Sequence, residues 1–245
     1  MAPSKTRINP ILDELIININ LCFIELLAAN MMHDLGRYSI ETIDDQAVIS
    51  PKVGFELHIE PIPIRYIKIF KDNFPYFILE VFHGKFVLLW HDLLSNIFSI
   101  YIELHFSNIR KFEELKKQEI RLDFNSPDNF NVQIKNGIID DFNFKEFSER
   151  QKLINKLLNP EGDGQEALVC ILKNILLRNI IQHRKNVIDD YILRKLGRDH
   201  IEILDNDGKI INYSVGDNFK LSIPEIYAFK KSILNIAQIW RIING

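Results

Sequence analysis

The sequence predicts a mainly α-helical fold, a helical bundle with a small N-terminal β-rich insertion and a C-terminal β-hairpin. Apolar residues recur at spacings of three and four over several long stretches, which is typical of helices packed on a core. Short β-prone pieces bounded by proline or glycine are confined to residues 36–71 and 201–213. The chain is 47% hydrophobic and 26% charged, as globular proteins are, so a disordered or fibrous class is excluded.

We expect residues 1–71 to form one unit, an N-terminal helix followed by a β-rich cap. Asn9 and Pro10 suit a helix N-cap and first helical position, so the helix is predicted to begin there and to reach about Met32. Its core-facing stripe comprises Ile11, Leu12, Leu15, Ile16, Ile19, Phe23, Leu26 and Leu27. Prolines then restrict any strands to edges, and short strands are predicted at 38–43, 47–49 and 54–59.

Residues 72–245 are predicted to form a second unit, a helical domain. Its helices are expected at 74–82, 86–112, 130–140, 141–158, 165–183 and 187–196, with a last one opened by the capping box of Ser222 and Glu225. The turn sequence Asp205-Asn206-Asp207-Gly208 predicts a hairpin between 201–204 and 209–213. The apolar stretch 86–106 is interrupted by residues such as Asp92, so we interpret it as a buried helix rather than a membrane span.

Charge and cysteine content exclude several classes of protein. Thirty basic and 33 acidic residues give a net charge of −3, so the chain does not coat nucleic acid by bulk positive charge. Cys22 and Cys170 are too few for a disulfide scaffold, and we expect both to be unpaired. The first ten residues lack the pattern of a signal peptide, which favours a soluble cytoplasmic protein. Phosphate-binding glycine loops, dinucleotide fingerprints and zinc motifs are missing, so no cofactor or metal is expected.

The most distinctive polar residues interrupt an apolar helix near its end. Arg178, Asn179 and His183 follow a core-like run, and the helix is predicted to break just after His183. Arginine is a permanently charged donor suited to phosphate, histidine exchanges protons near neutrality, and asparagine both donates and accepts. These three are therefore candidate catalytic residues. The alternative is a helix C-terminus whose Arg and His satisfy the last carbonyl groups.

Basic residues surround this helix end. Residues 178–198 hold six basic side chains against two acidic ones, a local charge of +4 in a chain of −3. A basic island on an acidic body fits a site for a polyanion. Its candidate binding residues, beyond the helix itself, are Arg184, Lys185, Arg194, Lys195 and Arg198.

The segment ILLRNIIQHRKNVIDDYILRKLG, residues 175–197, resembles the signature helix of the HEPN superfamily. Members of that family carry an arginine and a histidine separated by four to six residues, often with a polar residue after the arginine. Arg178, Asn179 and His183 match this motif. A short break and an apolar-apolar-Asp segment follow, matched by 184–186 and 187–189, with Asn186 where glycine is frequent. The resemblance covers residues 165–196 well and 72–240 loosely.

The resemblance implies a dimeric helical domain that cleaves RNA without a metal, commonly as a toxin or anti-phage defence effector with an antitoxin or defence-system partner. Arg178 would bind the scissile phosphate, His183 would act as acid or base on the ribose 2′-hydroxyl or the leaving 5′-oxygen, and Asn179 would hold the phosphate. Arg178 and His183 are five residues apart, so their side chains point about 140° apart around a helix. A two-fold partner is therefore expected to complete the site. The alternative is a catalytically silent HEPN-type module that binds a protein or a nucleotide.

Overall fold

The described part of the chain is mainly α-helical, as predicted. The computed structural model describes residues 3–50, 60–109, 111–113, 122–125, 127–159 and 161–244. Within them lie eight α-helices: α1 (Pro3–Glu41), α2 (Ile64–Lys71), α3 (Phe74–Phe106), α4 (Phe130–Phe144), α5 (Phe147–Leu158), α6 (Gln165–Arg184), α7 (Asp190–Leu196) and α8 (Ile223–Asn244). Two antiparallel hairpins accompany them, β1 (Val48–Ile49) with β2 (Ile62–Pro63), and β3 (Ile201–Leu204) with β4 (Ile210–Tyr213).

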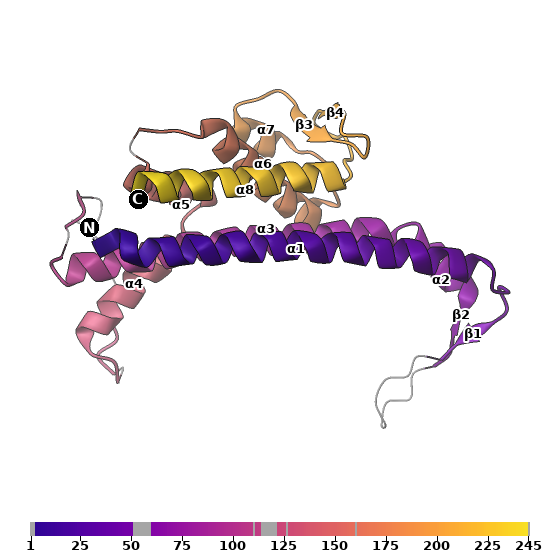
Figure 1. Ribbon diagram of the computed structural model, residues 1–245, viewed down its shortest axis with the longest axis horizontal. Helices are drawn as coiled ribbons and strands as arrows, with labels where there is room; N and C mark the ends of the chain where they lie inside the picture. Colours follow the sequence, from indigo (N-terminus) through magenta and orange to yellow (C-terminus); the bar gives the residue numbers. More distant parts are fainter. Residues whose placement is uncertain are drawn as a thin grey trace.

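Helices α1 and α3 form a long antiparallel pair that carries the rest of the molecule (Figure 1). Buried apolar residues recur every three or four positions along α1: Ile8, Leu12, Leu15, Ile19, Cys22 and Leu26. Two ion pairs set the register, because Arg7 lies 3.0 Å from Glu103 and Lys85 lies 3.3 Å from Glu25. This stripe, one face of a 3.6-residue period, is what joins α1 to its neighbours.

A second layer, made of α5 to α8 and the β3–β4 hairpin, lies on one side of the α1–α3 pair and leaves the end near α2 uncovered (Figure 1). Helix α8 is the centre of this layer and contacts both α1 and α6. Its predicted inward residues are all fully buried: Ile226, Phe229, Ile233, Ile236, Ala237 and Trp240. Trp240 stacks on Trp90 of α3 with ring centres 5.3 Å apart, which joins the two layers.

The C-terminal hairpin is confirmed. Strands β3 and β4 pair from Ile201 with Tyr213 to Leu204 with Ile210, around the predicted turn. Asp205 accepts two backbone N–H groups inside that turn, from Asp207 and Lys209. Cys22 and Cys170 are free thiols, as expected.

The N-terminal segment differs from the prediction in two ways. Helix α1 begins at Pro3, not at Asn9, and so contains Pro10. It also continues to Glu41, so the predicted strand at 38–43 is wrong. Glu41 is held there by ion pairs with Arg37 at 3.7 Å, one helical turn back, and with Lys71 of α2 at 2.7 Å. A strand is present at Val48–Ile49 within the predicted 47–49, while the predicted strand at 54–59 lies outside the described residues.

The helices after residue 72 also have different boundaries. Helix α3 runs unbroken through Gly84, where two helices were predicted, because its buried face continues on both sides of that glycine. It ends at Phe106 rather than 112. The break between α4 and α5 lies at Lys145 and Glu146, whose backbones are extended, and not at residue 140.

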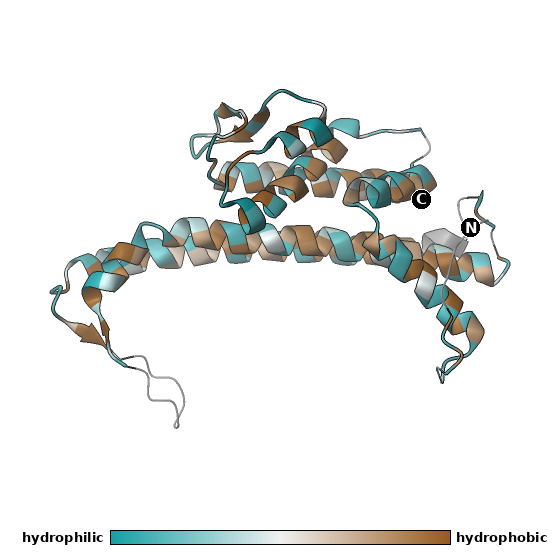
Figure 2. Ribbon diagram, turned by 180° about the vertical axis from the view of Figure 1, so that it is seen from behind, coloured by the Kyte–Doolittle hydropathy of each residue, from teal (hydrophilic) through white to brown (hydrophobic). Residues whose placement is uncertain are grey.

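Two helices are long and apolar enough to cross a membrane, Arg7–Glu41 and Phe74–Phe106. Inside the protein, 28% of the most apolar window of the first and 50% of that of the second are buried. The core helix of a soluble protein meets the same criteria of length and composition. The open side of helix α1 carries apolar residues that are all more than half exposed: Ile17, Leu21, Ile24, Met31, Leu35 and Tyr38. Figure 2 shows hydrophobic segments along the pair beyond the second layer.

Candidate functional site

Helix α6 positions the predicted catalytic residues and is fixed at both ends by left-handed backbone. Gly164 precedes it with φ of 76°, and a Cβ there would lie 2.7 Å from the Ile239 side chain. Lys185 and Asn186 follow it with φ of 51° and 65°, a left-handed conformation that asparagine tolerates better than most residues. Asn186 also donates its side-chain amide to Glu80 of α3 at 3.0 Å. The end of α6 is therefore held against α3.

His183 and Asn179 lie on the open side of α6. Both are exposed, and they line a pocket of about 260 Å³ between α6 and α7. The other lining residues are Leu176, Ile180, Arg184, Asp189, Tyr191 and Ile192. Asp189 caps α7 by accepting the Ile192 N–H at 3.0 Å. The pocket thus combines an imidazole, an amide and a guanidinium at the solvent boundary.

Arg178 lies on a different side of α6. Its side chain is half-buried, and its Nε is buried without a hydrogen-bond partner among the described residues. Its charge contributes to lowering the pKa of both His83 and His91, which places it beside α3. Arg178 does not line the pocket that holds His183. One chain therefore does not bring the two residues together, in agreement with the angle expected from their spacing.

The basic island is largely neutralised by acidic neighbours. Arg184 pairs with Asp189 at 3.7 Å, Arg194 with Asp190 at 3.0 Å, Lys195 with Glu146 at 2.5 Å and Arg198 with Glu202 at 3.6 Å. The bond to Glu146 raises the pKa of Lys195. Lys185 is exposed. Counting charges along the sequence overlooked Glu146 and Glu202, which lie outside the counted segment and next to it in space.

A buried polar network that sequence reasoning missed connects α3, α6 and α8; we define it as His83, Lys173, Asn174 and Glu225. His83 Nε2 donates to Asn174 Oδ1 at 3.0 Å, and Asn174 Nδ2 donates to Glu225 Oε1 at 3.0 Å. Lys173 lies 2.7 Å from the same carboxylate oxygen. The other Glu225 oxygen accepts the Leu204 N–H at 3.0 Å. Glu225 thus serves this network rather than completing its capping box, although its N–H bonds to Ser222 Oγ at 3.1 Å.

A second polar group, also missed, lies two turns further along α3; we define the arginine cluster as His91, Arg150 and Arg178. Arg150, on α5, is 8% exposed, and its Nη2 donates to His91 Nδ1. Burial, and then the charges of Arg150 and Arg178, lower the pKa of His91 to about 4. The ring of His91 meets Phe147 edge-on at 5.2 Å. In the sequence, His91 and Arg150 each interrupt an apolar helical stripe. Nothing in the sequence indicates that these two stripes pack against each other.

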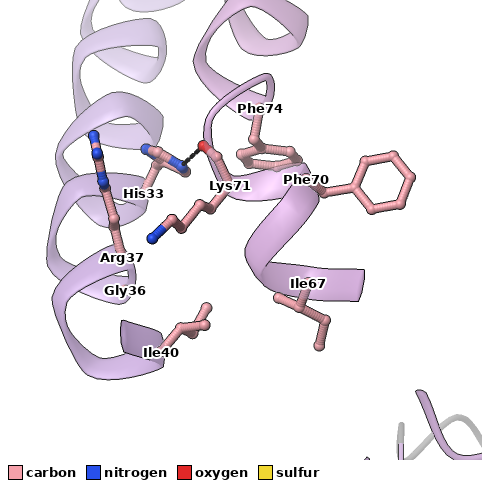
Figure 3. Close-up of a pocket in the computed structure, with 8 residues that line it drawn as sticks. All are labelled: His33, Gly36, Arg37, Ile40, Ile67, Phe70, Lys71 and Phe74. Carbon is pink, nitrogen blue, oxygen red and sulfur yellow. Dashed lines mark hydrogen bonds between the residues drawn. The ribbon is translucent and has the colours of Figure 1, made fainter. Parts of the chain in front are cut away.

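A third feature is an apolar pocket of about 230 Å³ at the far end of the α1–α3 pair (Figure 3). It lies between α1 and α2 and is lined by His33, Gly36, Arg37, Ile40, Ile67, Phe70, Lys71 and Phe74. His33 bonds to the Lys71 carbonyl at 2.9 Å and stacks on Phe74. The bond connects α1 with the end of α2, and the stack connects α1 with the start of α3.

The arrangement supports proton transfer and anion binding at two separate places on α6. Among the described ranges, no group of three or more His, Cys, Asp or Glu side chains could hold a metal ion. Comparisons of the chain with models of protein families, with curated proteins and with solved structures gave no match.

Proposed function

We propose that the protein is a metal-independent endoribonuclease of the HEPN type. The observation that carries the proposal is on α6. This helix presents Asn179 and His183 in a solvent-open pocket and leaves the Arg178 guanidinium without a hydrogen-bond partner at Nε among the described residues. An imidazole can transfer protons and a guanidinium can neutralise phosphate charge, and cleavage of a phosphodiester by its own 2′-hydroxyl can use both.

The proposed reaction needs only proton transfers. A base takes the proton of the ribose 2′-hydroxyl, whose oxygen attacks the phosphorus, while an acid gives a proton to the departing 5′-oxygen. The products are a 2′,3′-cyclic phosphate and a 5′-hydroxyl. His183 is assigned the acid or base role, Arg178 neutralises charge on the phosphorane-like transition state, and Asn179 holds a phosphate oxygen.

A second copy of the chain is part of this proposal. Arg178 and His183 point to different sides of α6, so a homodimer across a two-fold axis at this helix would bring a histidine of one protomer to the arginine of the other. RNA would then lie over the α6–α7 surface, with Lys185 and the paired cations Arg184, Arg194, Lys195 and Arg198 around it. A cytoplasmic toxin or defence effector with an antitoxin or other partner protein fits this activity.

The second candidate is a silent HEPN-type module that binds a protein or a nucleotide. The observation that favours it is the pairing of four island cations with carboxylates, which lowers the charge available to RNA. Arg178 and His183 themselves are not in ion pairs with Asp189 or Glu202, the arrangement that this alternative would predict most directly.

The test is cleavage of a ribo-oligonucleotide in EDTA by wild type, His183→Ala and Arg178→Ala. We expect wild-type cleavage, with a loss of at least about 100-fold in His183→Ala, since proton transfer typically contributes that much or more. Gln182→Ala, a change to the exposed neighbour of His183, is the matched control and should retain activity. Wild type that does not cleave RNA in any ionic condition, or full activity in His183→Ala, would overturn the proposal. Sedimentation with and without RNA tests the dimer.

A further inference from the structure

The arginine cluster contains two positive charges and no negative one. Arg150 is 8% exposed, and its hydrogen-bond partner among the described residues is the neutral ring of His91. The Nε atoms of Arg150 and Arg178 are both buried and have no hydrogen-bond partner among the described residues. Burial lowers the pKa of Arg150 from its usual value, which reflects the cost of holding this charge away from water.

Charges in protein interiors normally have a counter-charge, because an uncompensated buried ion is strongly unfavourable. The polar network, which shares α3 and α6 with the cluster, follows this rule, since Lys173 of α6 meets Glu225 of α8. Nearby acids do not serve the arginine cluster: Glu146 pairs with Lys195, and Asp141 pairs with Lys145. The missing partner is therefore expected to be an anion from outside the chain.

The geometry of the donors points to the type of anion. The Arg150 guanidinium, on α5, donates to the imidazole, and the charge of Arg178, on α6, acts on the same ring. Each guanidinium offers a fork of N–H donors that matches the oxygens of a phosphate group. His91 accepts from Arg150 through Nδ1, so its proton is on Nε2, which is a further donor. Arg178 and His91 are half-buried, so part of each side chain reaches solvent.

We propose that Arg150, Arg178 and His91 form a binding site for a phosphate group. In the proposed function Arg178 binds the scissile phosphate, and this proposal adds Arg150 and His91 to that phosphate site. The inference rests on the proposed function in one respect, that the phosphate belongs to RNA. The affinity for a phosphate group as such can be measured without any cleavage.

The primary experiment measures the midpoint of thermal unfolding during titration with inorganic phosphate, at constant ionic strength set with chloride. We expect saturable stabilisation of wild type. In Arg150→Met the concentration for half-saturation should rise about tenfold or more, as expected for one lost charge-assisted contact. Arg37→Met is the matched control, because Arg37 is already paired with Glu41 and Asp72 at the far end of the molecule. The control should bind phosphate as wild type does.

Two results would overturn the site: no phosphate-specific stabilisation of wild type, or equal stabilisation of wild type and Arg150→Met. Should Arg150→Met fail to fold, Arg178→Met, at a half-buried position, takes its place with the same expectation. A fully 2′-O-methylated RNA and a nucleoside monophosphate are then added as competitors. Competition by the RNA joins the site to the proposed function. Phosphate binding without competition by RNA would leave the site in place and remove RNA as its ligand.

Discussion

The polar network around His83 and the arginine cluster around His91 share helices α3 and α6 but differ in their charges. The two histidines are eight residues apart on α3; His83 bonds to Asn174 of α6, and His91 bonds to Arg150 of α5. In the network a lysine meets a glutamate at 2.7 Å. In the cluster Arg150 donates to an uncharged ring on which the charge of Arg178 also acts. Burial is the largest cause of a pKa of about 4 for both histidines, so their titration alone does not separate the two sites.

What separates the sites is charge balance. Both oxygens of the network's carboxylate have partners within one chain, and its positive charge has a counter-charge, although His83 Nδ1 is buried without a partner among the described residues. The cluster has two positive charges and no negative one, and a bound anion would balance them. Two neighbouring polar groups can thus have different roles, one stabilising the fold and the other binding an anion. Three measurements on the protein without ligand test this difference between the two sites.

The largest expected effect is at Glu225. Replacement by alanine leaves Lys173, Asn174 and the Leu204 N–H without their partner, so the free energy of unfolding should fall by about 3–5 kcal/mol, as when one member of a buried pair is removed. Urea unfolding measures this change. Glu225→Gln keeps the acceptor for Leu204 and should lose less. A loss below about 1 kcal/mol in Glu225→Ala would show that the network does not hold the fold.

The next effect is the pH dependence of stability that His83 produces. Its pKa is about 4 in the folded protein because of burial, against about 6.5 when unfolded, so the unfolded chain binds more protons between these values. The free energy of unfolding should therefore decrease as the pH falls from about 6.5 to about 4, by about 3 kcal/mol from this residue.

Urea unfolding at pH 7, 6, 5 and 4 measures this dependence, with His83→Gln as the comparison. The amide of glutamine can still donate to Asn174, but it does not titrate. The variant should lose the His83 part of the slope and keep the part from His91. Identical slopes in wild type and His83→Gln would mean that His83 is not a buried neutral group.

The smallest effect is at Arg150. Removal of an uncompensated charge should cost little, so Arg150→Met, which keeps the aliphatic length, is expected to change the free energy of unfolding by less than about 1 kcal/mol and in either direction. The same urea experiment without phosphate measures it, with Glu225→Ala as the contrasting variant. A loss as large as that of Glu225→Ala would indicate an internal partner for Arg150 and would make the two sites equivalent.

Sequence patterns predicted the parts of the fold that depend on local periodicity. The stripe of α8 and the turn around Asp207 were predicted correctly, since each is specified within about twenty residues or fewer. Predictions were wrong where distant contacts override local preference. Helix α1 continues to Glu41, where α2 lies against it and Lys71 pairs with Glu41, and Gly84 lies within a helix whose buried face continues past it.

The candidate site was predictable to a similar extent. The spacing of Arg178 and His183 on one helix predicted that their side chains point to different sides of it, and in the structure they do. Partners on other helices were not predictable, because His91 and Arg150 are 59 residues apart and meet only through the packing of α3 against α5. The neutralisation of the basic island has the same cause, since Glu146 reaches Lys195 across 49 residues.

The contact between the first and last helices has a consequence for synthesis on the ribosome. Asp13 of α1 pairs with Arg241 of α8 at 3.0 Å, and Phe23 meets Tyr227, so part of α1 is covered by a helix that is translated much later. About 180 residues separate the two helices. At roughly 5–20 residues per second, that interval lasts about 10–40 s. During this time the nascent helix exposes the apolar side chains that α8 will cover, in addition to those on its open side. Chaperones that bind exposed apolar segments are expected to bind the growing chain in this interval.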